Sequence, residues 1–407
     1  MTAARPRVVS VDALRGLVMF TMIYVNDISG AKHVPWWMKH YSDSFKGSGM
    51  TFVDLVFPAF LFIVGMSIPF ALGARIARGE PIWRILGHVL VRTLSLLVIG
   101  ILMVNSESGP NGRQMGWSRT AWTSLLYLAA ILSFCTVRPR VLTIVLRVIG
   151  WGTMIFLAFA YRGSKGERII ELHSTWPAVS IRTEWYGILG LIGWAYLVAC
   201  IVYLIFRTNR VALLGCMVLL LCLFVADRKG AFDGFWLADV VGIGETLGSQ
   251  ASITVAGMIM ATLLITADTQ DHWRRIRFAV LFALGCAAAA LLVHRLYGIS
   301  KNNATPSWCL WACAITTLLW VNFYLISDVW NKANRLKLFA IAGQNVLLAY
   351  LISDGVPSWL RAVHLNNWYA RLAEPNLACA MARSVGIAIL VLTVSALLNR
   401  VGFWLKL

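Results

Sequence analysis

The sequence predicts an all-α polytopic membrane protein, a bundle of about twelve transmembrane helices. Hydrophobic residues make up 59% of its 407 residues and charged residues only 13%, whereas a soluble protein carries about 25% charge. The apolar residues fall in runs of about twenty, the length that a helix needs to cross a bilayer. These runs fill the whole chain, so we expect one transmembrane domain over residues 1–407 and no separate soluble domain.

Each expected helix is an apolar run bounded by short polar or charged segments. The expected spans are residues 9–27, 51–73, 84–104, 118–137, 141–161, 185–206, 210–227, 250–267, 277–295, 307–329, 337–356 and 377–401. The second run contains Pro58 and Pro69, which remove helical N–H donors. It is therefore expected to be a kinked helix whose freed carbonyls need other partners.

The net charge of +18 is explained by membrane orientation. Lys and Arg concentrate in short loops on one side, such as those around Arg75, Arg138 and Arg274, and short positive loops face the cytoplasm. Both termini are then expected to be cytoplasmic. No basic, aromatic-rich soluble module is present, so nucleic acid is not an expected partner.

The eight cysteines lie within the apolar runs, and none has a CxxC or Cys/His spacing. Neither disulfides nor a metal site is therefore expected. The first apolar run follows basic residues, as in a signal peptide, but Asp12 and Arg15 interrupt it and no small-residue cleavage site follows. We expect this run to remain as a helix.

Ionisable residues inside spans are functional candidates, weighed against structural pairing. Asp12 and Arg15 share a helical face and can neutralise each other, either as an anchor or as part of a ligand site. Asn26 and Asp27 close the first helix at the outer surface. Asp54 lies in the first turn of the second helix, where capping through the helix dipole and a functional role are equally open.

Two histidines, His33 and His40, lie in the loop between the first two helices. This loop runs from the helix end that carries Asn26 to the helix that begins near Asp54, which can bring an imidazole beside a carboxylate. Such a pair is suited to general base or nucleophilic work. The other histidines are interfacial or lie in loops without a motif.

Polar residues also border two later spans. Lys301 and Asn302 lie just outside the tenth expected helix, and Gln344 and Asn345 fall within the eleventh. Amides inside a span usually bond to neighbouring helices. The alternative is that they contact a substrate.

Several segments resemble the heparan-α-glucosaminide N-acetyltransferase family and its bacterial homologues, within the broader group of transmembrane acyltransferases. The segments are SVDALRG at 10–16, YVND at 24–27, the Lys-His at 39–40 and TFVDLVFPAFLFIVGMSI at 51–68, followed by WYGILGLIGWAYL at 185–197, KNNATPSW at 301–308 and GQNVLLAY at 343–350. The resemblance implies a catalytic histidine at His40 and the acidic residue of the second-helix motif at Asp54. The substrate-binding candidates are Asn26, Asp27, Lys301, Asn302 and Asn345.

The sequence also departs from the family pattern. Gly190 and Leu191 stand where the family has a Gln-Arg pair, and the family's DPEG-like motif is hardly recognisable around Asp239 and Glu245. The span count also leaves an apparent extra helical hairpin near residues 118–161. The acceptor therefore stays open.

The resemblance implies an enzyme of a bacterial inner membrane that moves an acetyl group from cytoplasmic acetyl-CoA to an amino sugar or glycan on the periplasmic side. The CoA-binding candidates are Asp12, Arg15, Arg75 and Arg78. Other expected partners are membrane lipids and a second copy of the chain in a homodimer. The alternatives are O-acylation of a surface glycan, and a transporter or flippase.

Overall fold

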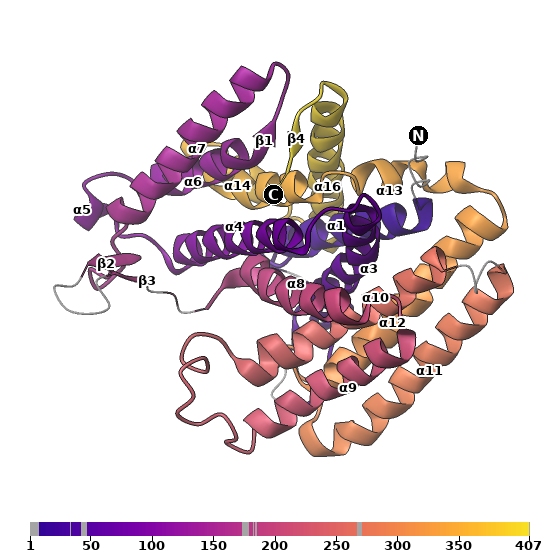
Figure 1. Ribbon diagram of the computed structural model, residues 1–407. Coiled ribbons are helices and arrows are strands. Elements are labelled where there is room, and N and C mark those ends of the chain that lie inside the picture. Colours follow the sequence, from indigo (N-terminus) through magenta and orange to yellow (C-terminus); the bar gives the residue numbers. More distant parts are fainter. Residues whose placement is uncertain are drawn as a thin grey trace. The chain divides into compact units, whose positions relative to one another are not determined.

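The computed structural model describes residues 8–32, 34–41, 47–172, 179–181, 183, 185–266 and 271–406. It confirms the all-α class, because helices follow one another along nearly the whole chain (Figure 1). The α-helices are α1 (Val9–Ile28), α3 (Val56–Ala77), α4 (Ile82–Ser108), α5 (Gly112–Met115), α6 (Arg119–Phe134), α7 (Arg140–Ala160), α8 (Gly187–Phe206), α9 (Arg210–Asp227), α10 (Ala251–Ile265), α11 (His272–Tyr297), α12 (Pro306–Tyr324), α13 (Lys337–Ala342), α14 (Val346–Ala362), α15 (Asn366–Arg371) and α16 (Leu377–Arg400).

Shorter elements join these helices. The 3-10 helices are η1 (Trp36–Met38), η2 (Phe52–Leu55) and η6 (Ala333–Leu336), and the π-helices are η3 (Ile243–Gln250) and η5 (Leu325–Val329). The strands are β1 (Cys135–Thr136), β2 (Ile170–Leu172), β3 (Val179–Ile181) and β4 (Trp404–Leu405). β1 pairs antiparallel with β4, and β2 pairs antiparallel with β3.

The described residues contain ten helices that are long and apolar enough to cross a membrane, as expected for a multi-pass protein. Two expected runs differ from a regular span. The run 118–137 forms α6, which has only 16 residues. The run 337–356 is divided into α13 and α14, where Gly343 and Asn345, both weak helix formers, interrupt the helix.

The chain divides into two compact units. Unit 1 comprises Met1–Val25, Pro35–Thr93 and Leu191–Gln344, and unit 2 comprises Asn26–Val34, Leu94–Gly190 and Asn345–Leu407. In unit 1, α10 packs against α3, α9 and α12, and α11 packs against α12. In unit 2, α6 packs against α7 and α14, and α14 also contacts α16.

Two glycines allow α3 and α10 to pack closely in unit 1. A Cβ atom at Gly65 would lie 1.8 Å from the carbonyl oxygen of Thr254, and one at Gly257 would lie 1.9 Å from that of Phe62. Small residues permit this approach of two backbones inside a membrane. The contact fixes α3, which directly follows η2, the short helix that contains Asp54.

Candidate active site

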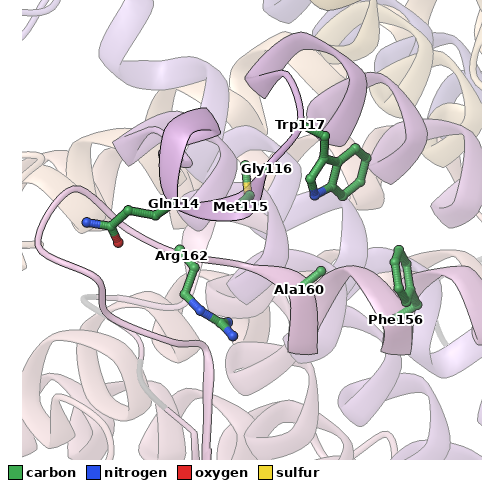
Figure 2. Close-up of a pocket in the computed structure, with 7 residues that line it drawn as sticks. All are labelled: Gln114, Met115, Gly116, Trp117, Phe156, Ala160 and Arg162. Atoms are coloured by element: carbon green, nitrogen blue, oxygen red, sulfur yellow. The ribbon is translucent and has the colours of Figure 1, made fainter.

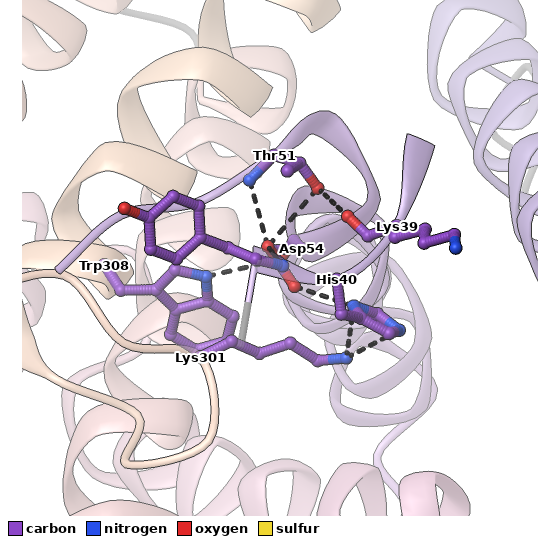
Figure 3. A network of polar contacts seen from close by, with 7 residues as sticks. Lys39, His40, Thr51, Asp54, Lys301 and Trp308 are labelled. Carbon is purple, nitrogen blue, oxygen red and sulfur yellow. Dashed lines mark hydrogen bonds and ion pairs between the residues drawn. The ribbon is translucent and has the colours of Figure 1, made fainter. Parts of the chain in front are cut away.

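His40 and Asp54 form the closest pairing of an imidazole with a carboxylate in the described part of the chain. Nδ1 of His40 lies 2.7 Å from Oδ1 of Asp54 (Figure 3). The Asp54 side chain is 2% exposed, whereas that of His40 is 35% exposed. The carboxylate is therefore buried behind a ring that remains accessible. The two predicted catalytic residues are brought together by the fold.

The second carboxylate oxygen of Asp54 organises the backbone around it. Oδ2 accepts hydrogen bonds from the backbone N–H of Thr51 at 2.9 Å and of Tyr41 at 3.0 Å. The Thr51 hydroxyl donates to the carbonyl oxygen of Lys39 at 2.7 Å. The residues on both sides of His40 are thus tied to the start of η2, which fixes the backbone from which the imidazole projects.

The sequence explains why η2 begins here. Thr51 precedes Asp54 by three residues, and together they form a capping box, in which the Asp54 carboxylate binds the backbone N–H of Thr51. Asp54 therefore caps the helix with one oxygen and holds His40 with the other. The capping interpretation of Asp54 concerns its Oδ2 atom, and the functional interpretation concerns its Oδ1 atom, which contacts His40.

Lys301 reaches this pair from a distant part of the sequence. Its Nζ atom lies 3.2 Å from Nδ1 and 3.3 Å from Nε2 of His40. Nearly equal distances to both nitrogens place the ammonium against the face of the ring. The loop that carries Lys301 is joined to the loop before η2, because Gly49 N–H donates to Ile299 O at 3.0 Å and Ile299 N–H donates to Ser48 Oγ at 2.7 Å.

This arrangement has a defined chemical capacity. An ionised carboxylate only accepts hydrogen bonds, so Nδ1 of His40 is the donor to Asp54 and Nε2 keeps a lone pair. Nε2 can then take a proton or attack a carbonyl carbon. The ammonium of Lys301, within 3.3 Å of Nε2, is placed to stabilise negative charge that develops near this atom.

The predicted CoA-binding cations are engaged in ion pairs. Arg15 Nη1 donates to Asp12 Oδ1 at 3.0 Å, and Arg15 Nη2 donates to Ser67 Oγ at 2.7 Å. Arg75 and Arg78 both donate to the carboxylate of Glu80. Hydrogen bonds from these two arginines lower the pKa of Glu80 below its ordinary value. Their role toward CoA stays a prediction.

Asp27 lies in a structural network of unit 2. Arg383 Nε donates to Asp27 Oδ2 at 3.0 Å, the Tyr369 hydroxyl donates to Oδ1 at 2.6 Å, and the Ser384 hydroxyl donates to Oδ2 at 2.6 Å. Burial and the hydrogen bond to Asp27 raise the pKa of Tyr369 above its ordinary value. The neighbouring Asn26 is exposed and hydrogen-bonds with Asp354.

The two remaining amide candidates differ in their surroundings. Asn345 is buried in unit 2 and donates from Nδ2 to Asn399 Oδ1 at 2.8 Å, the bond between helices that is usual for an amide in a span. Asn302 is exposed in the turn after Lys301. His33 lies outside the described residues.

A separate hollow of about 480 Å³ lies in unit 2 near α5 and the end of α7 (Figure 2). Its wall includes Trp117 and Phe156, whose ring centroids are 6.3 Å apart, and Arg162, which donates to the carbonyl oxygens of Phe159 and Tyr161. The described residues that line this hollow include no histidine, cysteine or carboxylate, so none of them is placed there as a general base or a nucleophile.

Sequence reasoning missed two residues around the His40–Asp54 pair. Thr51 had a detectable signal, because a threonine three residues before an acidic residue at a helix start is typical of a capping box. Trp308, whose Nε1 atom lies 3.3 Å from the backbone oxygen of Asp54, ends the KNNATPSW segment, but nothing in that segment links it to Asp54. The two residues are 254 positions apart, so only the folded chain reveals the contact.

Comparisons with known proteins show what this chain is similar to. A family model described as a domain of unknown function (DUF5009) matches residues 7–170. The heparan-alpha-glucosaminide N-acetyltransferase of Homo sapiens is 40% identical over 148 residues, which are 34% of this chain and 21% of the human protein. That of Mus musculus is 33% identical over 138 residues, 32% of this chain and 19% of the mouse protein. The matches cover about a fifth of these relatives and confirm the family resemblance.

Proposed function

Because the chain is related to the heparan-α-glucosaminide N-acetyltransferases, we propose that it is a membrane acyltransferase that moves an acetyl group from acetyl-CoA to the amine of an amino sugar. The observation that carries this proposal is the 2.7 Å contact between His40 Nδ1 and Asp54 Oδ1. It leaves Nε2 of a partly exposed histidine available for chemistry. Lys301 lies against the same ring.

In the direct route, the acceptor amine attacks the thioester carbon of acetyl-CoA. His40 Nε2 takes a proton from the amine as the C–N bond forms. The negative charge that develops on the thioester oxygen is stabilised by Lys301. The C–S bond then breaks, and the leaving CoA sulfur takes the proton from Nε2. The products are the N-acetyl sugar and free CoA.

Asp54 acts on the imidazole in two ways during this transfer. It keeps the proton of the neutral ring on Nδ1, so that the lone pair is on Nε2. It also stabilises the imidazolium that forms when Nε2 takes the proton, as a buried carboxylate does in hydrolase triads. Its own position is fixed by the hydrogen bonds from Thr51 and Tyr41.

A two-step route uses the same atoms. Nε2 of His40 attacks the thioester carbon, CoA leaves, and the acetyl group on Nε2 is then transferred to the acceptor amine. The direct route requires both substrates to be bound together, whereas the two-step route gives ping-pong kinetics. Initial rates at varied concentrations of both substrates separate the two.

The donor and acceptor are proposed to approach from opposite sides of a bacterial inner membrane. Positively charged short loops support a cytoplasmic face for the loop around Arg75 and Arg78. CoA carries phosphates, which suit such cations, and Arg15 is a further candidate. Alternating spans then place His40 and Lys301 toward the periplasm, where the sugar acceptor would bind.

The test is to incubate purified protein with acetyl-CoA labelled in the acetyl group and with glucosamine or glucose as acceptor. We expect CoA release coupled to labelling of glucosamine, and little labelling of glucose. The His40→Ala protein should lose turnover by about 10²-fold or more, the usual size of a general-base loss. Equal turnover by wild-type protein and His40→Ala would contradict the proposed mechanism. Label crossing sealed vesicles without transfer to any acceptor would indicate a transporter instead.

A further inference from the structure

The junction between η2 and α3 leaves the backbone oxygen of Asp54, a residue of η2, without an α-helical donor. In a regular α-helix, the carbonyl of residue 54 accepts a hydrogen bond from the N–H of residue 58. Residue 58 is Pro58, which is buried and has no N–H. The backbone oxygen of Asp54 therefore cannot receive the i+4 bond that a continuing α-helix would supply. Inside a membrane such an oxygen needs another donor.

Trp308 supplies a donor to this oxygen. Its indole Nε1–H points to the backbone oxygen of Asp54 at 3.3 Å (Figure 3). The Trp308 side chain is fully buried, with 0% exposure. Since an indole N–H only donates, a buried tryptophan usually has an acceptor, and the acceptor here is the carbonyl that has no i+4 donor because residue 58 is proline.

The hydrogen bond of Trp308 also links Asp54 to the part of the chain that carries Lys301. Trp308 lies in the first turn of α12, seven residues after Lys301. The loop that carries Lys301 leads directly into that turn. The indole therefore connects the residue that holds His40 to the element that presents the ammonium.

We propose that Trp308 is a positioning residue that sets the His40–Asp54 pair at the correct distance from Lys301, using the carbonyl freed by Pro58. The inference rests on the proposed function for its effect on turnover. Trp308 acts through Asp54 and the Lys301 loop. It should therefore affect the rate of the chemical step more than the binding of acetyl-CoA.

The first test compares two tryptophans in the same chemical setting. Trp122 is also 0% exposed, and its Nε1 donates to the backbone oxygen of Leu157 at 3.1 Å in unit 2. Trp308→Phe and Trp122→Phe thus lose the same volume and the same kind of hydrogen bond. We expect Trp308→Phe to lower kcat by about tenfold or more, since small misplacements of reacting groups cost up to about 10²-fold. The KM for acetyl-CoA should stay within about twofold, and Trp122→Phe should keep its kcat.

The second test restores the missing donor by another route. In the double variant Pro58→Ala/Trp308→Phe, the alanine N–H can give the Asp54 oxygen its helical hydrogen bond. We expect this variant to recover at least part of the kcat that Trp308→Phe loses. A loss of kcat that is equal in Trp308→Phe and Trp122→Phe would overturn the proposal. An unchanged kcat in Trp308→Phe would also overturn it.

A readout without turnover separates this inference from the proposed function. With isotope-labelled histidine, the NMR signals of the His40 ring should shift in Trp308→Phe, return toward wild type in the double variant and stay unchanged in Trp122→Phe. If wild-type protein transfers no acetyl group but the ring signals follow this pattern, the proposed acetyl transfer is wrong, and the positioning role of Trp308 is still supported. If Trp308→Phe does not fold, 3-benzothienylalanine at position 308 removes only the N–H. Unshifted ring signals in that protein would refute the positioning role.

Discussion

Asp54 binds His40 with one carboxylate oxygen while its other oxygen caps a helix. Oδ1 lies 2.7 Å from His40 Nδ1, and Oδ2 accepts the backbone N–H of Thr51 at 2.9 Å. A single side chain thus fixes both the start of η2 and the orientation of the imidazole. The two interactions can be changed separately by substitution, and their losses appear in different measurements.

Asp54→Asn should lower turnover strongly and change the thermal stability little. Asparagine caps helices about as well as aspartate, so its Oδ1 is expected to keep the bonds from Thr51 and Tyr41. Its NH₂ group then faces His40 Nδ1, which favours the tautomer that has no lone pair on Nε2. The same substitution in a hydrolase triad costs about 10⁴-fold, and we expect a loss of about 10²- to 10⁴-fold here.

The measurement for Asp54→Asn is the acetyl-transfer rate and the melting temperature of one preparation. A normal acetyl-transfer rate would show that Asp54 serves only as a helix cap. If the rate and the melting temperature both fall strongly, the cap has failed as well, and the expected separation of the two roles is wrong. Asp54→Glu serves as a comparison, because it keeps the charge but displaces both oxygens.

Thr51→Val should lower kcat, whereas Thr51→Ser should keep most of it. Valine has nearly the shape of threonine but lacks the hydroxyl that donates to the carbonyl oxygen of Lys39 at 2.7 Å. Without it, the backbone before His40 is held less firmly. We expect a loss of about tenfold, because reacting groups must be held within fractions of an ångström.

The matched control for Thr51 is Thr143. Its hydroxyl is buried and donates to the carbonyl oxygen of Val137 at 2.8 Å in unit 2. Thr143→Val should lower stability by a similar amount, about 1 kcal/mol for one hydrogen bond, and leave kcat unchanged. If Thr143→Val and Thr51→Val lose the same fraction of kcat, the effect of Thr51 is only on general stability.

The fold was predictable from the sequence to the extent that it depends on local composition. Apolar runs predicted the helices, and Pro58 in the second run predicted a carbonyl that lacks its i+4 donor. The close packing of Gly65 against Thr254 had no local signal, because the two residues belong to helices far apart in the chain. The break between α13 and α14 was missed because Gly343 and Asn345 stand within an otherwise apolar run.

In the candidate site, too, the residues with a local sequence signal were predictable and the contacts between distant residues were not. His40 and Asp54 were found because they lie in one short segment with a recognisable motif, and Thr51 was within reach of the capping rule. Lys301 stood out as a polar residue beside a span, but only the resemblance grouped it with His40, since 261 residues separate the two. Trp308 escaped prediction because a buried tryptophan in a span ordinarily indicates packing.

Lys301→Met should lower kcat and leave the KM for acetyl-CoA nearly unchanged. Methionine keeps most of the side-chain length but removes the ammonium that lies 3.3 Å from His40 Nε2. Loss of one group that stabilises an oxyanion costs about 10²- to 10³-fold in kcat. Lys301→Arg keeps the charge in a different geometry and should give an intermediate rate.

The control for Lys301 is the exposed Lys332, and Lys332→Met should behave as wild type. A large rise in KM with kcat unchanged would assign Lys301 to ground-state binding instead.

Arg383→Met should lower the melting temperature substantially, because it leaves the Asp27 carboxylate without its cation. The side chains of Arg383 and Asp27 are 8% and 17% exposed, and their closest N–O distance is 2.9 Å. Removing one partner of a buried ion pair costs about 3–5 kcal/mol.

The matched control is the exposed pair of Lys32 and Glu374, at 75% and 53% exposure and 3.7 Å apart in the same unit. Lys32→Met should change stability by less than about 1 kcal/mol, as exposed pairs do. Thermal unfolding of the two variants side by side tests this. Equal melting temperatures would show that the Asp27 network contributes little to the fold and would favour the predicted role of Asp27 in binding substrate.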